Sequence, residues 1–318
     1  MDTSARFVGC DWGTSRLRLY LCSPRDAGPA VVLDARSGPG VGEIDDCFEA
    51  TFFELADDWV SPRGSVPVII SGMAGSTIGW KDAPYLDCPL DVTGIADGGI
   101  AFEARGVPFS IVAGLRCTNP LGAPDVMRGE ELQILGWMST ADPARASTHL
   151  IALPGTHNKW VRVRDGRIET FLTALTGELY ALLDRYSVIV AARGTDQIDA
   201  GAFRRGIEAA GELGAASLLH GLFATRSRQV LGSLPEACAS SYLSGLLVGS
   251  DVLGALAVFD DADEPPESIG LIGDAGLVDR YRIALAHLGR TARLNDAAEA
   301  AVAGYSAVYE QLRRRQSR

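Results

Sequence analysis

The stretch FVGCDWGTSRLRLYL at residues 7–21 decides the fold. It begins with four apolar or small residues, passes through a turn of small and polar residues at 11–15, and ends with three leucines that alternate with Arg18 and Tyr20. Alternation with a period of two is typical of a half-buried strand. The stretch therefore predicts a β-hairpin, and residues 30–35 predict a third strand after it.

The same order recurs in the second half of the chain. Residues 150–153 are apolar, a turn of small and polar residues follows at 154–158, and a further apolar run begins at Trp160. The Asp-Gly pair at 165–166 then predicts a tight hairpin that leads into a strand at 168–172. Both halves open with three strands and two turns, so the chain is expected to be duplicated in architecture.

Helical patterns fill most of the remaining chain, and single strands lie between them. The predicted helices span residues 44–60, 129–138, 177–186, 200–210, 215–226, 241–259, 277–288 and 296–314, and the predicted strands span residues 66–71, 109–113 and 268–272. Hairpins continued by strand–helix alternation indicate two α/β lobes. We place their boundary within residues 139–147, which gives an N-terminal lobe of residues 1–140 and a C-terminal lobe of residues 148–318.

Composition narrows the classes of function. The chain has 318 residues, enough for about two domains of roughly 150 residues each, and a formal net charge of -11. This charge disfavours nucleic acid and anionic membrane surfaces as partners, because long-range repulsion opposes both encounters. A small-molecule substrate is favoured, and a homo-oligomer is left open.

Two further features bear on location. The six cysteines include no CxxC pair, so we expect free thiols in a reducing compartment rather than a zinc site or a disulfide scaffold. The N-terminal residues lack a basic segment followed by an apolar run, so no signal peptide is predicted and the protein is expected to be cytoplasmic. The apolar stretch at 242–259 approaches membrane-spanning length, but Ser244, Ser250 and Asp251 interrupt it, so a buried core helix is expected.

Three turns carry residue types suited to a nucleotide, although the phosphate-binding pattern GxxxxGK[ST] is absent from the sequence. In the first, Gly13 allows an anion to approach the backbone, Thr14 and Ser15 supply hydroxyl and N–H donors, and the Asp11 carboxylate can hold water-bound Mg²⁺. A plain hairpin turn would account for the same residues.

The second and third turns lie in the C-terminal half. The second contains Gly155 and Thr156 and is followed by Lys159. The third follows a predicted strand and consists of Gly273, Asp274, Ala275 and Gly276, whose glycines permit close approach of a base or ribose. A tight strand–helix connection is the alternative for this third turn.

These turns resemble the two phosphate motifs and the adenosine motif of the acetate and sugar kinase, heat-shock and actin superfamily. Within it the chain is most similar to the 2-dehydro-3-deoxygalactonokinase family, through residues 11–13, 71–76, 79–81, 126–131, 154–157, 159–160, 176–179 and 243–247. The resemblance implies two actin-like (ribonuclease H-like) lobes with a nucleotide cleft between them. It also implies ATP and Mg²⁺, and transfer to the 6-hydroxyl of 2-dehydro-3-deoxy-D-galactonate in galactonate catabolism. The middle residue of the His157–Lys159 segment, Asn158, departs from the family pattern.

The sugar acid is assigned to the segment at residues 71–80. Gly75, Ser76 and Trp80 combine close approach, a hydroxyl and an aromatic surface, which suits a polar ligand with a carbon chain. Arg128 or Lys81 could bind the carboxylate of the substrate, and Arg128 would do so with a bidentate fork. A structural loop and, for Lys81, a solvated charge are the alternatives.

A base must accept the proton of the attacking hydroxyl, and Asp11, Asp125, Glu130 and Glu131 are the acidic candidates. Asp11 is assigned to the metal ion rather than to the proton transfer. The Gly-Glu-Glu string also resembles a segment of exopolyphosphatases in which the second glutamate lies at the reacting phosphate, so Glu131 leads and Glu130 is second. Acidic residues in the first turn of a helix are also favoured by the helix dipole alone.

Two other functions fit the same resemblance. One is a phosphohydrolase like the exopolyphosphatases, which would release phosphate without an acceptor. The other is an actin-like nucleotide-dependent scaffold, for which self-assembly would be expected.

Overall fold

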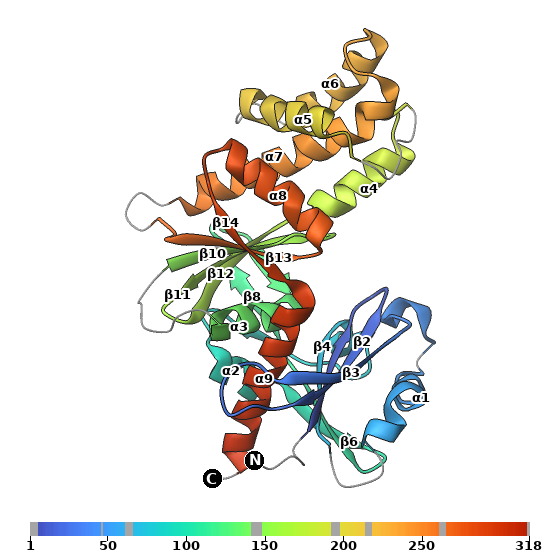
Figure 1. Cartoon of the computed structure of the whole chain (residues 1–318), viewed down its shortest axis with the longest axis vertical. Helices are drawn as coiled ribbons and strands as arrows, with labels where there is room; N and C mark the ends of the chain where they lie inside the picture. The colour runs from blue at the N-terminus through green and yellow to red at the C-terminus, as the bar shows by residue number, and fades with distance from the viewer. Residues whose placement is uncertain are drawn as a thin grey trace. The chain divides into compact units, whose positions relative to one another are not determined.

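The computed structural model describes residues 6–45, 47–60, 66–140, 148–191, 198–213, 218–260 and 265–316 (Figure 1). Their contacts form two compact units. Unit 1 contains Met1–Ala146, Val163–Thr170 and Asn295–Arg318, and unit 2 contains Ser147–Arg162 and Phe171–Leu294.

This grouping differs from the expected division in two segments. The C-terminal helix α9 (Ala297–Gln316) and the tip of the second hairpin belong to unit 1, whereas the sequence placed them in the C-terminal lobe. The reason is packing, because α9 lies against α3 (Glu130–Thr140) and α2 (Val92–Asp97) of unit 1. Most of the predicted boundary, residues 141–147, lies outside the described residues.

Unit 1 is built on a six-stranded sheet of order β3-β2-β1-β4-β7-β6. The strands are β1 (Phe7–Trp12), β2 (Leu17–Ser23), β3 (Val31–Gly38), β4 (Val68–Gly72), β6 (Ile100–Ala104) and β7 (Val107–Ile111). The first three strands are antiparallel, as the hairpin pattern predicted, while β4 runs parallel to β1 and β7 parallel to β4. Parallel neighbours bring the carboxyl ends of β1 and β4 to one edge of the sheet.

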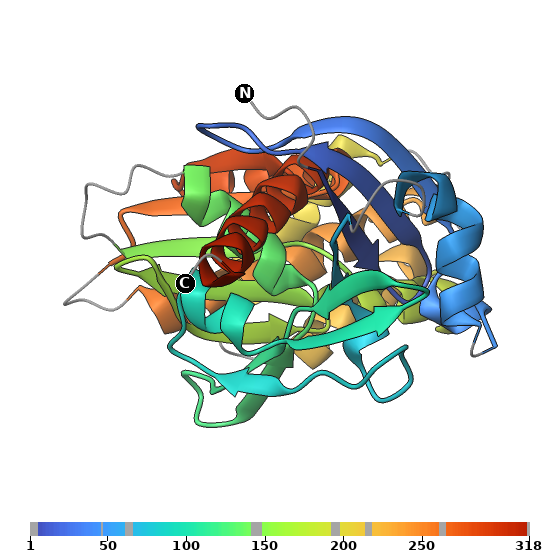
Figure 2. The same ribbon diagram turned by 90° about the horizontal axis from the view of Figure 1, so that it is seen from below.

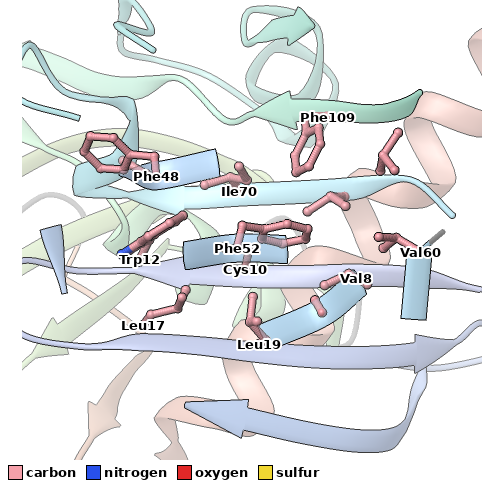
Figure 3. Packing of buried hydrophobic residues seen from close by; sticks show 14 of the residues in the cluster. Val8, Cys10, Trp12, Leu17, Leu19, Phe48, Phe52, Val60, Ile70 and Phe109 are labelled. Atoms are coloured by element: carbon pink, nitrogen blue, oxygen red, sulfur yellow. The ribbon is translucent and has the colours of Figure 1, made fainter. Parts of the chain in front are cut away.

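The alternation along β1 divides its side chains between two layers. Val8, Cys10 and Trp12 pack with Leu17 and Leu19 of β2 against Phe48, Phe52 and Val60 of α1 (Phe48–Val60). Ile70 and Phe109 belong to the same cluster (Figure 3). Gly9 points to the other face, where a Cβ would lie 2.6 Å from the Tyr305 ring of α9. Helix α9, red in Figure 2, therefore approaches the centre of the sheet closely.

The pair of α3 and α9 also packs backbone to backbone. A Cβ at Gly136 of α3 would collide with the carbonyl oxygen of Ala300, and one at Gly304 of α9 would collide with that of Leu132. A small sheet of β5 (Tyr85–Asp87), β8 (Gly114–Thr118) and β9 (Pro124–Met127) precedes α3. The sequence did not predict this sheet, and its strands have only three to five residues.

The sheet of unit 2 repeats the order of the first four strands of the unit 1 sheet. Its sheet has the order β12-β11-β10-β13-β14, in which β10 and β13 are parallel. The strands are β10 (Thr148–Leu153), β11 (Asn158–Arg164), β12 (Arg167–Ala174), β13 (Ser268–Gly273) and β14 (Ala292–Asp296). The duplication and the actin-like α/β fold class are confirmed.

Five helices accompany this sheet: α4 (Thr176–Tyr186), α5 (Ala200–Leu213), α6 (Leu218–Val230), α7 (Ala239–Phe259) and α8 (Ala275–His287). By length and composition the helical segment Glu236–Phe259 could cross a membrane, but 67% of its apolar window is buried inside the protein. Residues of α7 pack in two hydrophobic clusters of unit 2, so the prediction of a buried core helix is confirmed.

Candidate active site

The first phosphate turn lies at the carboxyl end of β1. Asp11 is still part of the strand, opposite Arg18 of β2 and Ser71 of β4, so the turn itself begins later than the sequence suggested. Gly13 N donates to the Arg16 carbonyl oxygen at 3.0 Å. Thr14 and Ser15 are exposed, and within the described part of the chain no group accepts from their amides. These amides are available to an anion.

The turn is fixed from behind by residues 40–42. Val41 N donates to the Gly13 carbonyl oxygen at 3.0 Å, and Gly42 N donates to that of Thr14 at 2.9 Å. Both carbonyls are thereby occupied by the protein. The turn thus presents donors rather than acceptors to a ligand.

Asp11 stands at the entrance to this turn. Its side chain is 20% exposed and accepts from Arg18 Nη1 at 2.9 Å. Burial raises the pKa of Asp11, the Arg18 charge opposes this rise, and the charge of Glu130 adds to it. A carboxylate whose proton affinity is raised by burial and by a neighbouring negative charge is stabilised as the anion by a bound cation.

The donor set fits Mg²⁺ in the form that this ion usually takes at phosphates. Among the described residues, no group of three His, Cys, Asp or Glu side chains could enclose a metal. Mg²⁺ commonly keeps several waters and binds through one or two carboxylates and the phosphates of the substrate. A single carboxylate, that of Asp11, is enough for such a protein contact.

The predicted sugar-acid segment follows β4. Gly72 has φ +87°, and the short turn η2 (Met73–Gly75) comes next. The Ser76 hydroxyl donates to the Met73 carbonyl oxygen at 2.7 Å, so its lone pairs remain for a ligand. A Cβ at Gly75 would lie 2.9 Å from Arg128 Nη1, so the glycine leaves room for that guanidinium.

Arg128 is therefore brought beside Gly75, as the prediction of a common site requires. Its Nη2 donates to the Ala83 carbonyl oxygen at 2.7 Å, and its Cζ lies 4.3 Å from the centroid of the Tyr85 ring. Nη1 is buried, and no described group accepts from it. One arm of the guanidinium is thus anchored, and the other has unused hydrogen-bonding capacity.

Trp80 has a different environment from the one we expected. Its ring packs edge-on or tilted against Trp12, Phe52, Phe102 and Phe109, with centroids 5.0–6.3 Å apart. The ring is therefore part of the aromatic core of unit 1. A contact between Trp80 and the sugar acid stays a prediction.

Glu131 lies in the first turn of α3. Gly129, with φ +110°, precedes the helix, and a Cβ there would lie 3.3 Å from Gly72 Cα. This approach places the start of α3 at the carboxyl end of β4, beside the strand that bears Asp11. The structure therefore brings the predicted base to the same sheet edge as the first phosphate turn.

The Glu131 carboxyl is fully buried. Oε2 accepts from Gly129 N at 2.6 Å, whereas Oε1 has no partner among the described residues. Burial, with a further contribution from the Glu130 charge, raises the pKa of Glu131 to about 8. Asp125, by contrast, is tied into the β8–β9 hairpin, where its Oδ1 accepts from Val126 N at 2.9 Å.

The raised pKa predicts a pH-dependent stability. Because the folded protein holds the Glu131 proton more tightly than the unfolded chain, the stabilisation from this group is complete below about pH 4.5 and is lost as pH rises towards about 8. The slope is at most about 1.4 kcal/mol per pH unit. Glu131→Gln should lack this slope. In urea unfolding at pH 5, 6, 7 and 8, the free energy of unfolding of the variant should rise relative to that of the native protein at each step. A difference between the two free energies that does not change with pH would contradict the buried, protonated carboxyl.

In unit 2 the second phosphate turn and the third turn lie together. Because β10 and β13 are parallel, both turns start at one sheet edge, and a Cβ at Gly273 would lie 3.4 Å from the Pro154 carbonyl oxygen. Asp274 caps α8, where its Oδ1 accepts from Gly276 N at 3.0 Å and from Leu277 N at 3.4 Å. Ala275 and Gly276 are exposed beside it.

The second phosphate turn is held by the start of α4. Glu178 N donates to the Thr156 carbonyl oxygen at 2.9 Å, and the Glu178 carboxylate contacts His157 Nε2 at 2.5 Å. Only glycine fits at position 177, because a Cβ would collide with the Gly155 carbonyl oxygen. Lys159 is 4% exposed and its Nζ donates to the His157 carbonyl oxygen at 3.3 Å, so its assignment to the nucleotide stays a prediction.

The sequence did not identify Asp251 of α7 as a site residue. Its Oδ2 accepts from Asn158 Nδ2 at 2.7 Å, from the Thr176 hydroxyl at 2.7 Å and from the Tyr281 hydroxyl at 2.6 Å, and its Oδ1 accepts from Trp160 Nε1 at 2.9 Å. Asp251 is the only charged residue of α7. An isolated carboxylate in an apolar helix is costly unless hydrogen-bonded, and this was the available signal.

Two units with the same order of their first four strands, each with glycine-containing turns at the carboxyl ends of parallel strands, place the protein in the actin-like structural class. The sequence pattern described as 2-keto-3-deoxy-galactonokinase matches residues 11–308. The chain therefore belongs to the 2-keto-3-deoxy-galactonokinase family.

Individual relatives agree over nearly the whole chain. A Rhizobium meliloti (strain 1021) protein named as a probable 2-dehydro-3-deoxygalactonokinase is 36% identical over 310 residues, which cover 96% of this chain and 97% of the relative. The 2-dehydro-3-deoxygalactonokinase of Escherichia coli (strain K12) is 34% identical over 287 residues, or 90% and 91% of the two chains. A Sinorhizobium meliloti crystal structure, assigned provisionally to the same activity, superimposes with a TM-score of 0.81 at 34% identity over 96% of this chain and 99% of that one.

Proposed function

We propose that the protein is an ATP-dependent kinase that phosphorylates the 6-hydroxyl of 2-dehydro-3-deoxy-D-galactonate in cytoplasmic galactonate catabolism. The family membership supports the substrate and the reaction. The observation that carries the proposal within the structure is the meeting of Asp11, the free amides of Thr14 and Ser15, and buried Glu131 at one edge of the unit 1 sheet.

The nucleotide is assigned to the three turns. In unit 1, Gly13, Thr14 and Ser15 are assigned to phosphate binding. In unit 2, Gly155 and Thr156 are assigned to it, with Lys159 near the second turn. Gly273, Asp274, Ala275 and Gly276 lie beside the second phosphate turn, which suits the ribose and base of the same nucleotide. Mg²⁺, held by Asp11, would neutralise charge on the transferred phosphoryl group.

The sugar acid is assigned to Gly75, Ser76, Trp80 and Arg128. Ser76 offers an acceptor, because its own proton is used on the Met73 carbonyl oxygen. Arg128 offers Nη1, which has no protein partner among the described residues, to the carboxylate of the substrate. Glu131 then accepts the proton of the attacking hydroxyl at Oε1, whose lone pairs are unused.

Acceptor dependence separates this function from its rivals. ADP release should be measured over a panel of aldonic and 2-keto-3-deoxy acids, with and without Mg²⁺. The proposal predicts ADP release that requires 2-dehydro-3-deoxy-D-galactonate. Phosphate release without any acceptor would favour a phosphohydrolase, and ATP-dependent light scattering with slow turnover would favour an actin-like scaffold.

The sugar-acid site should also distinguish the substrate from its C4 epimer. A buried polar group that loses its hydroxyl partner costs about 1–3 kcal/mol, which is roughly a 5- to 150-fold preference. We therefore expect a higher kcat/KM for 2-dehydro-3-deoxy-D-galactonate than for the epimer by a factor in that range. Ser76→Ala should reduce the preference if Ser76 contacts that hydroxyl. Equal kcat/KM values for both epimers in the native protein would show that the hydroxyl is not recognised.

A further inference from the structure

The geometry of unit 2 points to Asp251 as a positioning residue for the nucleotide, which fixes the second phosphate turn, the start of α4 and helix α8 relative to one another. This inference rests on the proposed function, since it concerns the ATP site of that reaction. It assigns a role to a residue outside the three turns.

The first link runs to the second phosphate turn. Asn158 directly follows that turn, is fully buried, and donates to Asp251 Oδ2 at 2.7 Å. Its own Oδ1 is buried without a partner in the described residues, so the bond to Asp251 is the side chain's anchor. Trp160, two residues further along β11 and also fully buried, donates to Asp251 Oδ1 at 2.9 Å. The Asp251 carboxylate is therefore hydrogen-bonded to β11, the strand that follows the second phosphate turn.

The second link runs to α4. Thr176 is the first residue of that helix, and its hydroxyl donates to the same Oδ2 at 2.7 Å. The next two residues touch the turn itself, through the close approach of Gly177 to Gly155 and the bond from Glu178 N to the Thr156 carbonyl oxygen. Asp251 thus holds the turn from both sides.

The third link runs to α8. The Tyr281 hydroxyl donates to Oδ2 at 2.6 Å, and Tyr281 lies in the helix whose first turn contains Ala275 and Gly276. Burial and the Asp251 charge hold the pKa of Tyr281 well above its usual value, so the hydroxyl keeps its proton and remains a donor. The Asp251 carboxylate therefore connects the second phosphate turn, through β11 and α4, to the third turn, through α8.

The location of Asp251 suits this role. A cavity of about 610 Å³ lies among α4, α5, α6 and α7, and Thr176 and Asp251 line it. The Asp251 carboxylate accepts four hydrogen bonds from protein side chains, three at Oδ2 and one at Oδ1, so its main contacts are with the groups that it orients. Losing it would leave four buried donors without their acceptor.

The test measures binding of a non-hydrolysable ATP analogue by calorimetry in the absence of sugar acid. Asp251→Asn keeps the shape of the side chain but offers one oxygen instead of two. It should reduce the affinity for the analogue by about 10-fold or more. Thr176→Val and Tyr281→Phe each remove one hydrogen-bond donor to Asp251, and each should reduce the affinity for the analogue by less. All three should leave the KM for the sugar acid within about 2-fold of the native value, with the loss appearing in the KM for ATP.

Ser240→Ala is the matched control. It removes another α7–α4 hydrogen bond, from the Ser240 hydroxyl to Asp184 Oδ1 at 2.5 Å, that touches neither turn. It should lower the melting temperature without changing affinity for the analogue. If Asp251→Asn does not fold, Thr176→Val and Tyr281→Phe decide the question.

Folded variants that bind the analogue with native affinity would overturn the positioning role and leave a purely structural one. Equal weakening by Ser240→Ala would overturn it as well. A native protein that does not bind the analogue at all would instead contradict the proposed function, so the two failures are distinguishable.

Discussion

Asp11→Asn is expected to lower phosphoryl transfer on the order of 10³-fold while leaving the protein folded. Removing one preorganised electrostatic contact to the reacting group typically has an effect on this scale. Asp11 is the acidic side chain at the entrance to the first phosphate turn, within electrostatic reach of Glu130. Its bond to Arg18 is partly exposed, so its loss should change the free energy of unfolding by only about 0–1 kcal/mol.

Mg²⁺ titrations of kcat/KM provide the measurement for Asp11, with Arg18→Gln as the control. Arg18→Gln removes the partner of Asp11 but keeps the carboxylate, so metal-dependent activity should persist. Asp11→Asn should show little response to Mg²⁺ over the same range. Near-normal turnover with an unchanged Mg²⁺ dependence in Asp11→Asn would remove this residue from the site.

Glu131→Gln is expected to slow transfer by roughly 10²–10⁴-fold, the usual span for loss of a general base. Gln has nearly the same shape, so binding of ATP and sugar acid should be preserved and the loss should fall on kcat rather than KM. Phosphoryl transfer has a loose transition state, in which positioning and electrostatics carry much of the catalysis. The ranking of variants is therefore more informative than the size of any single effect.

Single-turnover transfer should be compared for Glu131→Gln, Glu130→Gln and Asp125→Asn. Glu131→Gln should be the most impaired, because Asp125 is held in the β8–β9 hairpin and Glu131 has the unpartnered, buried Oε1. If it is the least impaired of the three, the base lies elsewhere.

The pH dependence gives a second, independent criterion for the base. In the native protein kcat/KM should rise with pH towards about 8, because the base acts only after losing its proton. Glu130→Gln should move this limb to lower pH, since the Glu130 charge raises the pKa of Glu131. If the rise of kcat/KM with pH is unchanged in Glu131→Gln, it must be caused by the titration of another group.

Local pattern was sufficient to predict the hairpins and most helices. Residues 7–21 form β1 and β2 because alternating leucines can bury one face of a strand, and this information is contained in adjacent positions. The same reasoning gave the helix of α9 but not its location. Its packing on α3 depends on Gly136 and Gly304, which are far apart in the sequence and carry no periodic signal.

The site shows the same division. Asp11, Gly13 and Gly155 could be selected because a strand followed by a glycine turn is a local feature. Asp251 could not, since its hydrogen bonds join residues 30 to 93 positions apart. The packing of Trp80 in the aromatic core could not be predicted either, because the four rings that it contacts come from four separate segments.

The most direct test of the proposed kinase activity is the balance between ATP consumed and sugar phosphate formed. With MgATP and 2-dehydro-3-deoxy-D-galactonate, ³¹P NMR should show one phosphate ester, at the 6-position, for each ADP released, and ADP should not accumulate without the sugar acid. Inorganic phosphate that appears in place of the ester, at a rate unaffected by the sugar acid, would contradict the assignment as a sugar-acid kinase.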